Sequence, residues 1–213
     1  MRDTDLYTRI LGIEAPWQVS AVKVEMTKKE IVVQVERKPG EKLCCRTCGK
    51  ELSGYDTRRR RWRHLDTCQY KTILEANVPR VKCPEHGVVT TLVPWAEPNS
   101  GFTAMFEALV IDWLKEASTS AVSRLMGLSW NAIDGIMQRA VKRGLARRGQ
   151  MCARRLGVDE TAFKKRHDYV TIVSDQSAGM VLHVGLDRKK AGLKEWYESL
   201  PESYLRAIES VSM

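Results

Sequence analysis

Two short turns that carry cysteine and histidine constrain the fold of this chain more than any other feature. Cys45 and Cys48 are separated by two residues and followed by glycine, and Cys83 and His86 repeat that arrangement. In a zinc knuckle, a tight turn lets two ligands converge on one ion while backbone amides face the sulfurs. The two turns therefore predict one zinc site with four ligands, Cys45, Cys48, Cys83 and His86.

The alternative interpretation of these turns is a set of buried free thiols beside an ordinary surface histidine. Two matched turns favour zinc over that alternative, and the two-residue gap to Cys48 favours Cys45 over Cys44 as the ligand. Cys68 and Cys152 have no partner at ligand spacing, so we expect them to be packing residues.

The charge of the chain indicates a polyanionic partner. The 213 residues include 35 Lys and Arg against 26 Asp and Glu, a formal net charge of +9, with an ordinary hydrophobic content of 43%. Many cations favour phosphate backbones through counterion release. No apolar run of about 18 residues and no secretory signal occurs, so we expect a cytosolic chain that binds nucleic acid and no membrane.

The first half of the chain has the alternation of half-exposed strands. Residues 18–26 and 30–37 predict a hairpin with a turn at 27–29, and residues 70–78 predict a strand between the two knuckles. An arginine run precedes that strand, with Trp62 and His64 interleaved. A solvated face would explain the run, but the aromatic residues favour contact with DNA phosphates. The predicted contacts are Arg58, Arg59, Arg60, Arg61 and Arg63.

A proline- and glycine-rich segment, 94–101, marks a boundary before a helical region. Thr103 and then Ser118 or Thr119 are expected helix caps, and Gly127 predicts the turn of a helix-turn-helix. Its second helix would begin near Ser129 and present polar side chains to a major groove. A three-helix structural bundle is the alternative. From Gly135 to Val158 there is no acidic residue, which predicts a backbone clamp. The predicted DNA contacts are Ser129, Trp130, Asn131, Asp134, Gln138, Arg139, Lys142 and Arg143.

The last part of the chain predicts a small sheet around one aspartate. A short apolar strand, 156–158, would end at Asp159, followed by a hairpin of 169–174 and 180–185, a helix near 193–200 and an apolar segment, 208–213. A strand end can hold an oxygen ligand for magnesium, although an isolated aspartate there more often makes a turn. Glu160, Asp175 and Asp187 are weaker candidates.

Together, the Cys-x-x-Cys at 45–48, the knuckle at Cys83, the helix-turn-helix near 119–137, "GVDE", "HDYVTIVSD" and "LRAIESVSM" resemble the DDE-type transposases of bacterial insertion sequences, most closely the ISL3 family. The resemblance implies an RNase H-like core with Asp159 as first catalytic carboxylate. It also implies Mg²⁺ or Mn²⁺ for the intact enzyme, and a chain truncated before its second catalytic aspartate. His86 departs from the pattern, which suggests cysteine there; imidazole is an acceptable zinc donor.

We therefore expect an α+β multidomain chain: an N-terminal helix and hairpin (1–38), a β-rich zinc ribbon (39–97), a helix-turn-helix domain (98–150) and a partial RNase H-like domain (151–213). The resemblance implies a transposase fragment, inactive by itself, that binds double-stranded transposon ends (terminal inverted repeats) as a homodimer. Two alternatives stay open: a non-catalytic DNA-binding regulator, and a zinc-stabilised module that binds RNA.

Overall fold

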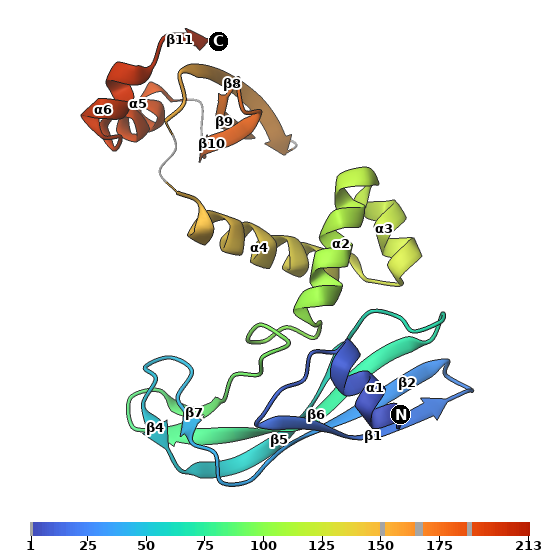
Figure 1. Ribbon diagram of the computed structural model, residues 1–213. Coiled ribbons are helices and arrows are strands. Elements are labelled where there is room, and N and C mark those ends of the chain that lie inside the picture. The colour runs from blue at the N-terminus through green and yellow to red at the C-terminus, as the bar shows by residue number, and fades with distance from the viewer. Residues whose placement is uncertain (1, 150–151, 165–167, 187–188) are drawn as a thin grey trace. The chain divides into compact units, whose positions relative to one another are not determined.

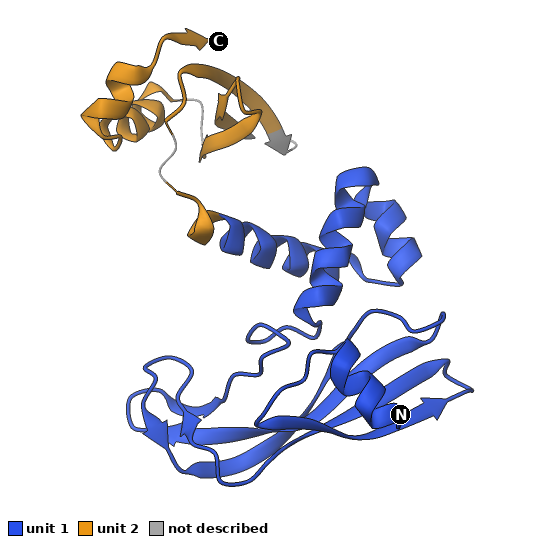
Figure 2. Ribbon diagram, viewed as in Figure 1, with its two compact units in different colours: residues 1–144 blue, residues 145–213 orange. Residues whose placement is uncertain are grey.

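The computed structural model describes residues 2–149, 152–164, 168–186 and 189–213 of the chain (Figure 1). The chain divides into two compact units, Met1–Gly144 and Leu145–Met213 (Figure 2). Each unit has its own hydrophobic clusters. None of the helices in the described residues is long and apolar enough to cross a membrane.

A five-stranded sheet forms the base of the first unit. It follows the short helix α1 (Asp3–Ile10) and comprises the strands β1 (Trp17–Glu25), β2 (Glu30–Arg37), β5 (Gly54–Arg63), β6 (Lys71–Cys83) and β7 (Gly87–Thr90). The order is β1-β2-β6-β5, and β7 pairs with β6. All neighbours are antiparallel except β2 and β6, which run parallel. The expected hairpin of 18–26 and 30–37 is therefore present, but it shares one sheet with strands beyond the boundary expected at residue 38.

Alternation along these strands builds the main core of the first unit. The burial pattern of β6 switches between buried and less buried positions, because successive side chains point to opposite faces. Trp62 and Trp17 each make an edge-to-face contact with Trp95, at centroid distances of 5.4 and 4.9 Å. A short hairpin, β3 (Leu43–Cys44) and β4 (Glu51–Leu52), forms a separate two-stranded sheet, packs against the end of β6 and carries the first knuckle in its turn.

Three helices complete the first unit, and local sequence signals set their ends. They are α2 (Ala104–Glu116), α3 (Thr119–Met126) and α4 (Trp130–Arg147). Thr103, Ser118 and Ser129 each accept a backbone N–H of the first turn, at 3.3, 3.3 and 3.2 Å. Gly127 ends α3 with φ +61°, a conformation that disfavours side chains with a Cβ. Five fully buried side chains form the core of the helices: Phe106, Val110, Val122, Ile133 and Ile136.

The second unit is a four-stranded sheet with two helices. Its elements are β8 (Arg155–Lys164), β9 (Asp168–Asp175), β10 (Met180–Gly185), α5 (Lys190–Glu198), α6 (Glu202–Ala207) and β11 (Ser210–Ser212). The strand order is β10-β9-β8-β11, with β11 parallel to β8 and the other pairs antiparallel. The sequence pattern predicts one helix in this region; the structure has a second, α6, which follows Pro201.

The strand that carries Asp159 is longer than the sequence analysis expected. Asp159 does not end the strand; it lies within β8 and is paired with Ile172 of β9. The polar residues after Asp159 remain in the strand because β9 pairs with them on the same ladder, a tertiary constraint that the apolar pattern does not reveal. Of the acidic alternatives, Asp187 lies outside the described residues.

Candidate metal centre and nucleic-acid interface

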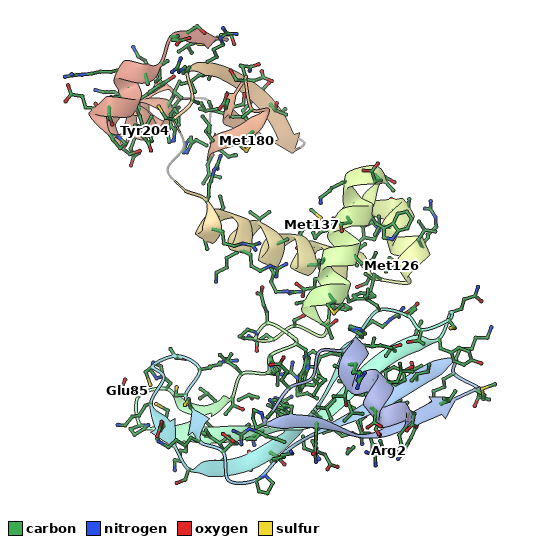
Figure 3. All side chains as sticks on the ribbon, in the orientation of Figure 1. Arg2, Glu85, Met126, Met137, Met180 and Tyr204 are labelled. Carbon is green, nitrogen blue, oxygen red and sulfur yellow. The ribbon has the colours of Figure 1, made fainter. Side chains whose placement is uncertain are left out.

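The structure brings the four predicted zinc ligands together. The Sγ atoms of Cys48 and Cys83 lie 3.8 Å apart, and Nδ1 of His86 lies 3.5 Å from Cys83 Sγ and 3.8 Å from Cys45 Sγ. All four ligand atoms lie within 4.8 Å of one another. Glu85, labelled in Figure 3, lies in the second knuckle between Cys83 and His86.

These distances fit a tetrahedral zinc ion. With Zn–S bonds of about 2.3 Å and a Zn–N bond of about 2.05 Å, tetrahedral angles place two sulfurs about 3.8 Å apart and a sulfur and a nitrogen about 3.6 Å apart. A disulfide would require sulfurs at about 2.05 Å, so the cysteines are separated as metal ligands are. Backbone N–H groups of Cys48 and Thr47 point at the Cys45 sulfur and lower the pKa of its thiol, which favours the thiolate that binds metal.

Local backbone and packing position the ligands. Gly49 and Gly87, directly after the knuckles, have φ values of +73° and +67°, which lets each chain reverse tightly beside its ligands. Cys45 and Cys83 are buried with Val81, and Leu43, Leu52 and Val89 pack against them. The remaining thiols are elsewhere: Cys44, Cys68 and Cys152 are all exposed. The expectation that Cys68 and Cys152 are packing residues is therefore wrong, since neither is buried.

The arginine run divides into two sets because β5 alternates. Arg59 and Arg61 both contact Glu75, and Arg61 also contacts Glu30 on β2. Arg63 makes a bidentate contact with Asp66. In the other set, Arg60 lies 5.6 Å from the centroid of the Trp62 ring, and Arg58 pairs with no carboxylate among the described residues.

The helix-turn-helix presents part of the predicted polar surface. Asn131, Asp134, Gln138 and Lys142 are exposed on α4, and Trp130 is 60% exposed at its start. Within this surface, Gln138 donates to Asp134 at 2.7 Å. Ser129 is used as the helix cap. Met137, labelled in Figure 3, lies on the same helix, and Ile133 and Ile136 hold its other side in the core.

Arg139 and Arg143 have a different environment from the rest of the predicted DNA contacts. Glu107 of α2 is only 1% exposed, and its carboxylate accepts from Arg139 at 2.8 Å, from Arg143 at 3.1 Å and from Ser100 at 2.8 Å. Arg143 also pairs with Glu97. The two arginines thus join α4 to α2. The role of Glu107 is not predictable from the sequence, because a lone glutamate on a helix carries no signal of burial.

A second buried polar contact joins the helices to the sheet. His64, 5% exposed, lies with Nδ1 2.9 Å from the Thr103 hydroxyl that caps α2. Burial lowers the pKa of His64, so the neutral imidazole is favoured and can accept a hydrogen bond from the threonine hydroxyl. Backbone hydrogen bonds between Arg63 and both Gly101 and Thr103 continue this junction.

Asp159 is exposed on the second unit, and its Oδ1 accepts the backbone N–H of Glu160 at 2.8 Å. Leu156, three residues earlier in the same strand, packs with Val158 and Trp196 on the opposite face. The described residues contain no second group of three or more histidine, cysteine or acidic ligands. Asp159 is therefore not part of such a cluster in this part of the chain.

Comparison with known proteins identifies three family regions in chain order. Residues 42–86 match the zinc-finger of transposase IS204/IS1001/IS1096/IS1165, residues 92–141 match the helix-turn-helix domain of transposase family ISL3, and residues 156–213 match the transposase domain of the same family. The first region contains the four converging ligands, the second contains the buried helical core, and the third contains Asp159.

Curated relatives point to the same family. The transposase for insertion sequence element IS1557 of Mycobacterium tuberculosis is 30% identical over 222 residues, covering 100% of this chain and 49% of the relative. The transposase for IS1001 of Bordetella parapertussis is 24% identical over 173 residues, covering 80% of this chain and 43% of the relative. The chain thus spans about half the length of these relatives, and no solved structure matches it. From its zinc-finger, helix-turn-helix and transposase domains, the chain belongs to the ISL3 family of transposases.

Proposed function

We propose that this chain binds transposon-end DNA and supplies the beginning of the catalytic domain of an insertion-sequence transposase, whose intact form cleaves and joins DNA strands. One observation carries the proposal: the three family regions follow one another in order, each on a separately packed part of the chain. The DNA would be the terminal inverted repeats of the element, bound by a homodimer.

In this proposal the zinc ion is structural. Cys45, Cys48, Cys83 and His86 would hold it, and the ligand distances support that assignment. Four protein ligands leave no open position for a substrate, as in structural rather than catalytic zinc sites. The ion would fix the two knuckles against each other and supply folding free energy that the small hydrophobic cluster around them does not.

Sequence recognition is assigned to α4. Its exposed amide side chains, Asn131 and Gln138, are of the type that contacts adenine edges in a major groove. Lys142 extends the same helix with a cation for the DNA backbone. Arg139 and Arg143 are held by Glu107, so we assign them the role of positioning α4 against α2 instead of contacting phosphates.

The second unit is assigned to an RNase H-like core. The order β10-β9-β8-β11, with antiparallel pairs among the first three strands and β11 parallel to β8, supports this fold. Asp159 would contribute one carboxylate to a centre for Mg²⁺ or Mn²⁺. Two-metal strand transfer needs carboxylates that hold both ions, and among the described residues Asp159 belongs to no group of three or more potential ligands. We therefore infer that residues 1–213 alone bind DNA without cutting it.

Binding and cleavage are tested on the purified, zinc-loaded chain. A labelled duplex carrying the element's terminal repeat should bind more tightly than a scrambled duplex of equal length, and Asn131→Ala with Gln138→Ala should remove most of that preference. Arg124→Ala, at an exposed side chain of α3, is the control variant. Equal affinity for both duplexes would contradict the proposal. Strand cleavage with Mg²⁺ or Mn²⁺, abolished by Asp159→Ala, would contradict the inferred inactivity.

A further inference from the structure

Beside the first knuckle lies a basic groove that the sequence analysis did not identify. It consists of two clefts that share Arg46, Thr91 and Leu92. Arg60 and Trp62 line the first cleft, and Arg37 and Lys42 line the second. We call this surface the knuckle groove. Its four cations are Arg37 at the end of β2, Lys42 just before β3, Arg46 in the first knuckle and Arg60 in β5, so successive elements of the chain each contribute one.

The knuckle groove differs from the rest of the ribbon in how its charges are balanced. Arg46 is exposed and pairs with no carboxylate in the described part of the chain. Arg60 is held by the Ser100 carbonyl at 3.2 Å and by the Trp62 ring, neither of which neutralises it. Arg59 and Arg61, the neighbours of Arg60 in β5, both contact the carboxylate of Glu75.

Acidic groups near the groove are occupied. Glu97 lines the first cleft, but its carboxylate pairs with Arg143. Glu51 pairs with Lys42 at 2.7 Å on the surface, where both side chains are more than half exposed and the pair is readily exchanged for another anion. Arg37 donates to the carbonyls of Glu41 and Lys42, which holds the loop and leaves its charge unbalanced.

The shape of the first cleft restricts what can bind. Its volume of about 20 Å³ holds roughly one water molecule and excludes a nucleotide base. Trp62, only 2% exposed, lines this space, and its Nε1–H has no partner among the described residues. Planar guanidinium groups at the rim of a space too small for a base suit the oxygens of a phosphate backbone.

We propose that the knuckle groove is the surface on which the ribbon holds the phosphate backbone of duplex DNA, with Arg46 and Arg60 as the main contacts. This inference rests on the proposed DNA-binding function and specifies the ribbon's share of it. Arg59, Arg61 and Arg63 belong to the internal ion pairs of the sheet and its turn. Of the arginine run, the knuckle groove therefore uses Arg60.

Two double variants of the zinc-loaded full chain test this assignment, because each removes two positive charges from the same region. Arg46→Ala with Arg60→Ala changes the groove, whereas Arg59→Ala with Arg61→Ala is the matched control. Fluorescence anisotropy with a short mixed-sequence DNA duplex is measured over a series of salt concentrations. We expect the groove variant to weaken binding at least about tenfold and to reduce the slope of log K against log salt by about two. The control should stay within about twofold of the wild type.

The outcomes separate the two levels of inference. Equal losses in both variants, or no loss in the groove variant, would overturn the assignment of the groove while leaving DNA binding intact. Absence of duplex binding by the wild type would overturn the proposed function itself. Tighter binding of single-stranded RNA than of the duplex would also overturn the assignment. Circular dichroism establishes that each variant is folded, and the single variant Arg46→Ala, at an exposed side chain, gives the same comparison if Arg60→Ala unfolds the sheet.

Discussion

Replacing Glu107 by glutamine should destabilise the first unit although the side chain keeps its shape. The carboxylate accepts from Arg139, Arg143 and Ser100 at 2.8, 3.1 and 2.8 Å while only 1% exposed. Each charge-assisted hydrogen bond contributes about 1.5–3 kcal/mol. The arginine side chains are 23% and 33% exposed, so water competes for them, and a neutral amide avoids the desolvation cost of a buried carboxylate. We expect a net loss of about 2 kcal/mol, or roughly 4–8 °C in Tm.

Thermal and urea unfolding followed by circular dichroism measure this loss. Glu97→Gln is the matched control, because it makes the same chemical change at a side chain that is 32% exposed and whose carboxylate, among the described residues, pairs with Arg143 alone. That variant should lose less than about 1 kcal/mol. If Glu107→Gln unfolds like the wild type, or only like Glu97→Gln, the buried carboxylate does not anchor α4 and the reasoning fails.

The contact of Arg139 with Glu107 also predicts how DNA binding should respond to a variant. If Arg139 positions α4 and touches no phosphate, Arg139→Ala should lower stability and leave the salt dependence of DNA binding unchanged. A phosphate contact would instead reduce the slope of log K against log salt by about one. Lys142→Ala, on the exposed side of α4, serves as the comparison and should show that reduction.

Three further perturbations test other parts of the structure. Removing zinc with a chelator should unfold the knuckles, measured by circular dichroism, and replacing Cys83 by serine should weaken the thiolate-to-cobalt absorption of the Co²⁺-substituted chain. Burial lowers the pKa of His64, so protonating its imidazole destabilises the folded chain. The stability that the neutral imidazole contributes is therefore present above the ordinary histidine pKa of about 6.5 and is lost as the pH falls below that value. In His64→Gln, the free energy of unfolding measured with urea should depend less on pH across that range. Gly127→Ala should cost about 1–2 kcal/mol in thermal unfolding, because φ is +61°, and Gly144→Ala, in α4 with open space around the added Cβ, should not.

Features set by neighbouring residues were predictable from the sequence. The spacing of Cys45, Cys48, Cys83 and His86 predicted their convergence, because each knuckle is a local turn and only the meeting of two turns needed the fold. Thr103 and Gly127 marked helix ends through hydrogen bonds and dihedral angles confined to one turn of chain.

Features that depend on distant partners were not predictable. Glu107 and Arg139 are separated by 32 residues, and nothing in either segment indicates that they meet. The pairing of Arg59 and Arg61 with Glu75 depends on the register of β5 against β6, and the contact with Glu30 depends on the parallel pairing of β2 with β6. Likewise, the extension of β8 beyond Asp159 follows from its ladder with β9 and not from its own polarity.

Strand β6 occupies the middle of the large sheet and ends at Cys83, one of the four ligands. The strand that supplies this zinc ligand therefore also supplies Leu74 and Val78 to the hydrophobic core. We expect loss of the metal to loosen the packing of Trp17, Trp62 and Trp95 as well as the knuckles. Intrinsic tryptophan fluorescence should then report whether the zinc site is occupied, with no label added.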